Sequence, residues 1–253
     1  MNESTTGAIN KVAQVDLFFW IMKICATTLG ETAGDLLSMT LNVGYAISSI
    51  ILLALFFVSL AAQLTSRTFR PALYWTVILT TSTAGTTMSD FMDRTLGLGY
   101  ATGTAILVTC LTMVLLVWRI SEKSLSVSRI ETTRAEAFYW VAILASNTLG
   151  TALGDYLADD SGLGFLGGAG LIAGLIGLVV VAYYTTRIDR VTLFWIAFVL
   201  TRPFGATFGD LLTKPVEKGG LDFGTIGSSL VLASILVVFI VFTIVRARRT
   251  LPQ

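Results

Sequence analysis

The sequence WIMKICATTLGETAGD occupies residues 20–35 and recurs in related form three times along this chain of 253 residues. The later copies are WTVILTTSTAGTTMSD at residues 75–90, WVAILASNTLGTALGD at residues 140–155 and WIAFVLTRPFGATFGD at residues 195–210. In every copy a glycine follows the tryptophan by ten residues, and an aspartate follows it by fifteen. Four copies with one spacing predict a fold built from four tandem repeats.

The composition excludes a water-soluble globular protein. Hydrophobic residues make up 54% of the chain and charged residues only 13%, with a mean hydropathy of +0.78. A soluble domain carries about 25% charged residues, so too few polar side chains remain here to cover a surface that faces water. We therefore expect an integral membrane protein.

Charge and residue usage exclude several functions. The net charge of +1 excludes a nucleic-acid binder with a broad basic surface. The chain has no histidine, which excludes a Ser-His-Asp triad and a histidine-rich metal site. Cys25 and Cys110 lie far apart in apolar segments and are expected to pack as small hydrophobic residues.

The chain contains eight apolar segments of two types, which alternate along the sequence. Those at residues 44–64, 98–118, 161–186 and 223–245 contain no charged residue and are long enough to cross a bilayer. Those at residues 17–38, 72–92, 137–158 and 191–212 carry the unusual polar residues. We predict an all-α polytopic membrane protein of eight transmembrane helices, forming one transmembrane domain over residues 1–253.

The predicted repeats cover residues 16–66, 71–120, 136–187 and 191–247, and a charged linker at residues 119–136 separates two halves. Each repeat has an even number of spans, so all four enter the membrane in the same direction. The repeats are then related by pseudo-four-fold symmetry, or the two four-helix halves by a pseudo-two-fold axis.

Basic residues predict the orientation, because positive charges accumulate on the cytoplasmic side. Only Arg94, Lys214 and Lys218 fall on the opposite side. We therefore place both termini and the charged linker in the cytoplasm. The basic residues on the cytoplasmic side are Lys11, Arg67, Arg70, Arg119, Lys123, Arg129, Arg134, Arg187, Arg190, Arg246, Arg248 and Arg249.

The W-x9-G-x4-D spacing in two-span repeats resembles a bacterial family of integral membrane proteins. That family is described as four tandem repeats of unknown function, each with two spans and a tryptophan. The resemblance covers about residues 16–246. It implies the architecture and a location in the bacterial cytoplasmic membrane, and it implies no activity.

Helical periodicity places the tryptophan and the residues 4, 7, 11 and 15 positions after it on one face. In the first copy this stripe is Trp20, Ile24, Thr27, Glu31 and Asp35. Polar groups that face lipid are costly, so the stripes should face inward, and the uncharged helices should form the lipid-facing wall. The candidate ion-binding residues are Asp35, Asp90, Asp155, Asp210, Glu31, Asn147, Thr27, Ser82, Thr86 and Thr151.

Two recurrent residue types allow alternative interpretations. The glycines, such as Gly30, either let helix backbones approach closely or break the helix and expose carbonyls to an ion. The tryptophans either anchor the helices in an aromatic belt at the cytoplasmic membrane surface or act as a gate on the stripe. The candidate gate residues are Trp20, Trp75, Trp140 and Trp195.

Charged residues inside the spans need partners. Four aspartates at one depth favour a cation-binding or cation-attracting role, and the alternative is pairing with a loop cation or with solvent. Arg202 should lie near the middle of the membrane, paired with Glu31 or alternatively with an aspartate. Lys23 is a further candidate charge partner. The candidate metal ligands are Glu31, Asp35, Asp90, Asp155 and Asp210.

These residues predict a membrane transporter for a small cation. The ligands offer oxygen atoms, which hard ions prefer; Mn²⁺ is the favoured ion, with coupling to protons through the carboxylates. The expected partners are the lipid bilayer and the transported cation, with no nucleic acid and no permanently bound cofactor. No nucleophile or nucleotide motif accompanies the carboxylates, so an enzyme is not expected.

Two other functions stay open. One is a carrier for a small organic or anionic solute, with Lys23 and Arg202 as counter-charges to the substrate. The other is a structural membrane subunit that transports nothing and whose charged residues pair only with each other.

Overall fold

The computed structural model describes residues 12–127, 130 and 132–249, and for residues 247–249 it describes the backbone only. Eight α-helices and no strand occur in this part of the chain, which confirms the all-α prediction. Lys11 and Arg129, used to predict the orientation, and the side chains of Arg248 and Arg249 lie outside the described residues. The helices are α1 (Leu17–Asp35), α2 (Tyr45–Thr65), α3 (Pro71–Asp90), α4 (Tyr100–Glu122), α5 (Thr133–Asp155), α6 (Gly164–Thr185), α7 (Arg190–Thr213) and α8 (Thr225–Arg249).

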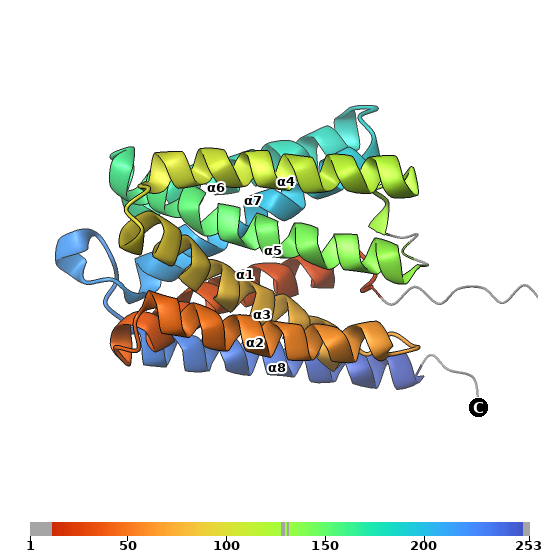
Figure 1. Cartoon of the computed structure of the whole chain (residues 1–253), viewed down its shortest axis with the longest axis horizontal. Helices are drawn as coiled ribbons and strands as arrows, with labels where there is room; N and C mark the ends of the chain where they lie inside the picture. Colours follow the sequence, from red (N-terminus) through yellow and green to blue (C-terminus); the bar gives the residue numbers. More distant parts are fainter. Residues whose placement is uncertain (1–11, 128–129, 131, 250–253) are drawn as a thin grey trace, which may run out of the picture.

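The odd-numbered helices all run in one direction along the bundle, and the even-numbered helices return in the opposite direction (Figure 1). This is the arrangement expected of four repeats with two helices each. α4 extends through Glu122 and α5 begins at Thr133, so the segment between the halves is shorter than the predicted linker of residues 119–136.

Local signals set where the odd helices begin. The side chains of Asp16, Thr132 and Asp189 accept hydrogen bonds from the backbone at the start of α1, α5 and α7, and Pro71 opens α3. Such caps satisfy backbone N–H groups that have no partner within the helix, and proline is well tolerated in the first turn.

The odd helices of the first three repeats pass directly into short π-helical turns (Leu36–Thr40, Phe91–Thr95 and Tyr156–Asp160). A glycine with positive φ then leads into each even helix, for example Gly44 at +82° and Gly99 at +73°, because a side chain is disfavoured in that conformation. The fourth repeat differs: α7 ends at Thr213, and a 3-10 helix (Val216–Lys218) lies in the loop before α8.

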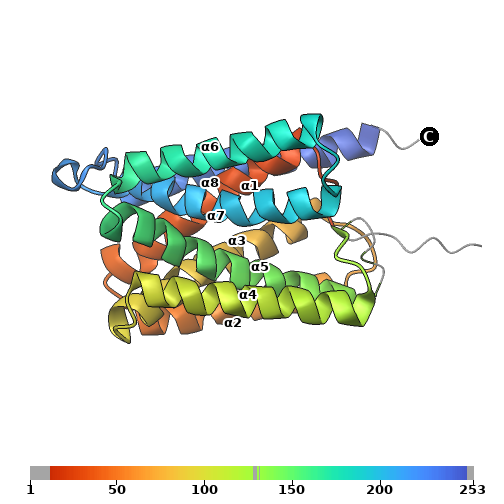
Figure 2. The ribbon, with the colours of Figure 1, turned by 90° about the horizontal axis from the view of Figure 1, so that it is seen from above.

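The four odd helices form a closed ring. α1 packs against α3 and α7, and α5 packs against the same two helices on the other side. Each even helix packs against the odd helix of the next repeat: α2 on α3, α4 on α5, α6 on α7, and α8 on α1, which closes the circle (Figure 2). The repeats therefore follow the pseudo-four-fold arrangement.

The repeated glycines are the contact points of this ring. A Cβ atom added at Gly30 would lie 2.2 Å from Ser82 Oγ, and one added at Gly205 would lie 2.6 Å from Thr27 Oγ1. The same relation joins Gly85 to Asn147 and Gly150 to Arg202. The helices continue through all four glycines, so the close-packing interpretation is confirmed and the helix-break interpretation is wrong.

Many polar side chains are buried between the odd helices, and many large apolar side chains of the even helices are exposed, which is unlike a soluble protein. Glu31 and Arg202 are at most 2% exposed, whereas Ile50, Leu166 and Leu230 on the even helices are at least 64% exposed. Five helices, α2, α4, α6, α7 and α8, are long and apolar enough to cross a membrane. These features are consistent with a membrane protein.

Candidate functional site

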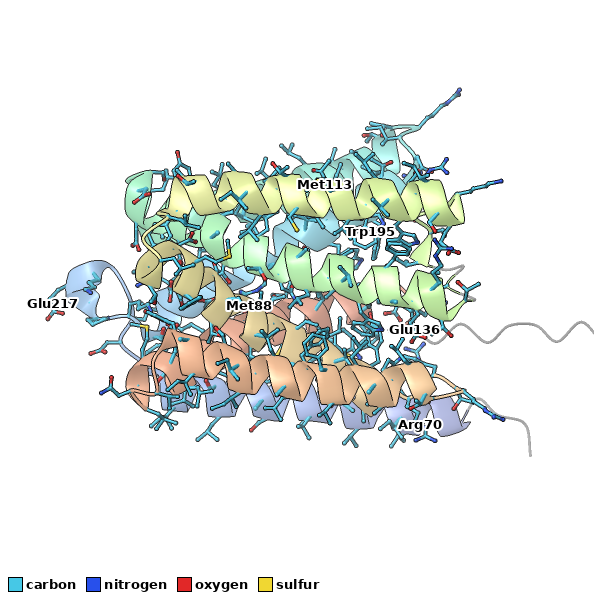
Figure 3. The ribbon with its side chains drawn as sticks, in the orientation of Figure 1. Arg70, Met88, Met113, Glu136, Trp195 and Glu217 are labelled. Atoms are coloured by element: carbon cyan, nitrogen blue, oxygen red, sulfur yellow. The ribbon has the colours of Figure 1, made fainter. Side chains whose placement is uncertain are left out.

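The inward stripes of the odd helices meet along the axis of the ring in successive layers. We call the end at which the odd helices begin the tryptophan end, and the end at which they finish the aspartate end. Figure 3 shows Trp195 toward the end of the bundle that also holds Arg70 and Glu136, with Glu217 projecting at the opposite, aspartate end.

At the aspartate end, two basic residues bridge the four repeat aspartates in pairs. Arg94 Nε lies 2.8 Å from Asp90 Oδ1, and its Nη2 lies 3.5 Å from Asp155 Oδ2. Lys214 Nζ lies 2.5 Å from Asp35 Oδ2 and 3.1 Å from Asp210 Oδ1. The four aspartates are at most 3% exposed. The four aspartates therefore pair with cations from the segments that follow α3 and α7, and their role in binding a transported cation stays a prediction.

Arg94 and Lys214 occupy the same position in two repeats, nineteen residues after the tryptophan and four after the aspartate. Each pairs with its own repeat's aspartate and with that of the next repeat. Burial by itself would lower the pKa of Lys214, but Asp210 and Asp35 raise it above its ordinary value. Asp90 and Asp155 likewise raise the pKa of Arg94 against its burial. Both side chains therefore stay positively charged.

From the sequence, Arg94 and Lys214 were predicted only to mark the orientation in the membrane and were not among the candidate site residues. The spacing that revealed the aspartates could have found them, because a residue four positions after an aspartate lies on the same helix face. The equivalent positions in the first and third repeats are Met39 and Asp159.

One turn deeper, the Arg202 side chain of the fourth repeat reaches all three other repeats. Its Nη1 donates to Glu31 Oε2 over 2.9 Å, and its Nη2 donates to Thr86 Oγ1 and, over 2.7 Å, to Thr151 Oγ1. Thr86 and Thr151 also donate to Glu31 Oε2. The predicted Arg202–Glu31 pair is confirmed, and pairing of Arg202 with an aspartate is wrong.

The hydroxyl groups of Thr27 and Ser82 serve contacts between helices. Thr27 Oγ1 donates to the carbonyl of Thr201 on α7, and the Ser82 hydroxyl packs against Gly30 on α1. Their backbone carbonyls both lie 3.4 Å from the Arg202 guanidinium. Their proposed role as side-chain ligands thus stays a prediction.

Lys23 lies in the layer between Arg202 and the tryptophan end. Its side chain is fully buried, and Nζ donates to Asn147 Oδ1 over 3.3 Å and lies 4.1 Å from the centre of the Phe198 ring. Asn147 in turn donates to Thr81 Oγ1. Among the described residues, no carboxylate lies within ion-pair distance of Lys23.

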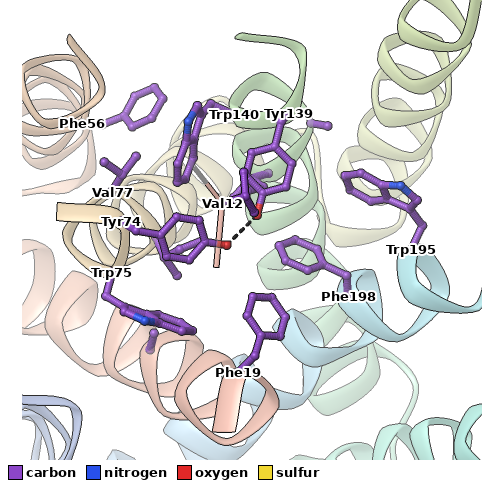
Figure 4. Close-up of a cluster of buried hydrophobic side chains, with 14 of the residues drawn as sticks. Val12, Phe19, Phe56, Tyr74, Trp75, Val77, Tyr139, Trp140, Trp195 and Phe198 are labelled. Atoms are coloured by element: carbon purple, nitrogen blue, oxygen red, sulfur yellow. Dashed lines mark hydrogen bonds between the residues drawn. The ribbon is translucent and has the colours of Figure 1, made fainter. Parts of the chain in front are cut away.

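Aromatic rings fill the axis at the tryptophan end (Figure 4). The hydroxyls of Tyr74 and Tyr139 share a hydrogen bond of 2.6 Å, and Trp75, Trp140 and Trp195 are at most 5% exposed. An aromatic belt facing lipid headgroups is therefore the wrong interpretation for these three tryptophans. The fourth, Trp20, is half-buried.

Three of the five predicted metal ligands converge. Glu31, Asp35 and Asp210 each place a carboxylate oxygen within 4.8 Å of the other two. Asp90 and Asp155 do not belong to this group and instead pair with Arg94. The three converging carboxylates are the side chains best placed to hold a cation.

The family model described as Repeat of Unknown Function (DUF347) matches residues 18–69, 73–124, 138–189 and 193–250. The chain belongs to this family. The four matches confirm the tandem repeats of this DUF347 protein. Neither the curated proteins nor the solved structures compared with the chain yielded a match.

Proposed function

We propose that this DUF347 protein is a membrane carrier for a small cation, with a hard divalent metal such as Mn²⁺ as the favoured substrate and protons as the exchanged ions. In this proposal all eight helices cross the bacterial cytoplasmic membrane, and both termini are cytoplasmic. α1, α3 and α5 are not among the five helices that are apolar enough by composition to cross a membrane, but most of their polar side chains are buried against the other odd helices.

The balance of charge around Glu31 and the four repeat aspartates carries this proposal. Glu31 and the four repeat aspartates share three basic partners, which are Arg202, Arg94 and Lys214. When every group of this set is ionised, its carboxylates carry two more negative charges than the three basic partners balance; the Lys23 ammonium lies in a separate layer toward the tryptophan end. Each unpaired buried charge costs several kcal/mol. One divalent cation, or two protons, would neutralise the excess.

The chemistry of the ligands favours a hard ion. Glu31, Asp35 and Asp210 offer only oxygen atoms, which suit Mn²⁺, Mg²⁺ or Ca²⁺. The soft ligand Cys25 points away from the axis, because its thiol contacts the carbonyl of Leu232 on α8. The thioether of Met39 lies 3.8 Å from Lys214 Nζ at the edge of the site, so one soft sulfur atom stands beside three hard carboxylates, and the ligand set as a whole favours a hard ion.

Side chains block the axis of the ring in two layers, which favours a carrier over an open pore. Arg202 spans the axis beside Glu31, and the Tyr74–Tyr139 layer fills it further toward the tryptophan end. A cation bound among the aspartates therefore reaches the other side only if these layers rearrange.

Transport assays in liposomes test the proposal. We expect the purified protein to transport Mn²⁺ in exchange for protons when a proton gradient is imposed across the liposome membrane. We expect Glu31→Gln, Asp35→Asn and Asp210→Asn each to abolish this Mn²⁺ flux. Asp160→Asn is the matched control, because Asp160 lies exposed at the same end of the bundle. Flux that persists in all three site variants would contradict the proposal.

A carrier for a small anionic solute is the second candidate function, and Lys23 favours it. A buried ammonium group without a carboxylate partner is suited to pair with an anionic group of a substrate. Anion exchange that is lost in Lys23→Met but retained in Asp35→Asn and Asp210→Asn would support this second function over the first.

A further inference from the structure

The aspartate end contains two clusters related by a pseudo-two-fold axis, and they differ in composition. The first cluster consists of Lys214, Asp210, Asp35 and Glu31. The second cluster contains, at the equivalent positions of the repeats, Arg94, Asp90, Asp155 and Thr151. The first cluster therefore has a third carboxylate where the second has a hydroxyl, and a lysine where the second has an arginine.

The two basic side chains are held differently. The Arg94 guanidinium bridges Asp90 and Asp155 from within a π-helical turn and lies 5.5 Å from the centre of the Tyr100 ring. An arginine presents a rigid planar group that matches several fixed partners at once. The second cluster thus has the features of a permanent clamp between repeats two and three.

Lys214 is held only through its ammonium group and the backbone around it. Its Nζ contacts Asp35, Asp210 and the sulfur of Met39. A lysine ammonium is a compact charge on a flexible chain, so it leaves its partners by rotation about side-chain bonds. The Lys214 side chain is 18% exposed and that of Arg94 is 32% exposed, so both have a route to the aspartate end, and the two differ in the flexibility of the charged group.

The loop after α7 keeps the Lys214 backbone in place. The N–H groups of Leu221 and Phe223 donate to the carbonyls of Leu211 and Leu212, and the N–H of Asp222 donates to the carbonyl of Lys214. Departure of the ammonium group therefore needs no opening of the loop.

We propose that Lys214 is a built-in counter-ion that competes with the transported cation for Asp35 and Asp210. A divalent cation held by Glu31, Asp35 and Asp210 would lie close to the Lys214 ammonium, and the repulsion between them would expel the lysine side chain toward the aspartate end. When the cation leaves, Lys214 returns and keeps the carboxylates paired. This inference rests on the proposed cation transport and assigns its regulation to one side chain.

Mn²⁺ binding to the purified protein tests the competition. We expect Lys214→Gln to bind Mn²⁺ at least about tenfold more tightly than the wild type, because a positive charge next to the site is lost. Lys218→Gln is the matched control: it removes the same charge from an exposed position in the same loop, and its affinity should change less than about threefold.

The outcomes separate this inference from the proposed function. Mn²⁺ binding that is lost in Asp35→Asn but unchanged in Lys214→Gln would overturn the role of Lys214 and leave cation binding intact. An equal gain in both charge-removing variants would also overturn it, since the effect would then be general electrostatics. An absence of Mn²⁺ binding in every protein would overturn the cation proposal and this inference together.

Amine labelling of the wild-type protein provides a second test that needs no substitution. Mn²⁺ should increase the modification of Lys214 by an acylating reagent, because the expelled ammonium group reaches water. Lys218 lies exposed in the same loop and should be labelled equally with and without Mn²⁺. Unchanged or decreased labelling of Lys214 in protein that binds Mn²⁺ would overturn the proposal.

Discussion

Arg202 on α7 donates a hydrogen bond of 2.9 Å to Glu31 on α1, and the two side chains are at most 3% exposed. These helices belong to the last and the first repeat, so the ion pair lies where the ring of repeats closes. The same guanidinium also contacts Thr86 and Thr151 of the two middle repeats. A single side chain thus joins all four repeats near the middle of the bundle.

The ion pair should be sensitive to the loss of either partner. Glu31→Gln and Arg202→Met each leave one buried charge unpaired, and we expect each to destabilise the protein by about 3–5 kcal/mol. Thermal unfolding in detergent measures the effect. The exchanged pair, Glu31→Arg with Arg202→Glu, should recover part of the lost stability, and no recovery would argue against direct pairing.

Loss of the Lys23 charge should not destabilise the protein, unlike loss of the Arg202 charge. It is fully buried without a carboxylate partner among the described residues, so Lys23→Met removes the cost of burying an ammonium group. We expect its melting temperature to equal or exceed that of the wild type. Arg202→Met, measured in parallel, should melt lower, and a comparable loss in Lys23→Met would reveal a partner for Lys23.

Close packing of the ring predicts that its glycines do not tolerate a methyl group. Gly30→Ala places Cβ against the Ser82 side chain and should destabilise the protein by about 1–3 kcal/mol. Gly174 on α6 has open space around its Cα. Gly174→Ala should therefore be neutral or slightly stabilising, because alanine favours the helix. Equal effects on the melting temperature would contradict the packing interpretation.

The hydrogen bond between the Tyr74 and Tyr139 hydroxyls predicts a non-additive mutant cycle. Tyr74→Phe leaves the buried Tyr139 hydroxyl without this partner, which should cost about 1–3 kcal/mol. The double variant Tyr74→Phe with Tyr139→Phe removes both polar groups and should be more stable than the sum of the single effects predicts. Additive changes in unfolding free energy would show that the two hydroxyls do not interact.

The contribution of Lys214 to stability should persist at alkaline pH. The pKa of Lys214 lies above its ordinary value of 10.5, so its stabilising effect is fully present below that pH and is lost only as the pH rises through the higher folded-state pKa. The difference in melting temperature between the wild type and Lys214→Met should therefore not fall between about pH 7 and about pH 9. A decreasing difference would mean that the ammonium loses its proton within this range.

Much of the architecture follows from the sequence. The W-x9-G-x4-D spacing predicted four repeats, and helical periodicity placed Trp75, Thr86 and Asp90 on one inward face. The need of a buried charge for a partner predicted the Arg202–Glu31 pair. These inferences succeeded because spacing within one helix determines which side chains share a face.

Which helices pack against one another was decided by the tertiary structure. Spacing did not reveal that α2 packs on α3, nor that α8 packs on α1 and closes the ring. It also left open whether Trp140 lies among the odd helices or in an aromatic belt at the membrane surface, and the packed ring buries it. Packing between helices depends on how each is rotated against the next, and that angle is set by contacts such as those at the repeated glycines.

The sequence by itself determined an inward set of carboxylates, and the tertiary structure decided how their charges are balanced. Asp90 and Asp155 share Arg94, whereas Asp35 and Asp210 share Lys214 and lie next to Glu31. The four aspartates are equivalent by spacing, but an ion pair depends on distances of a few ångströms between different helices. Only the packed ring brings those atoms together.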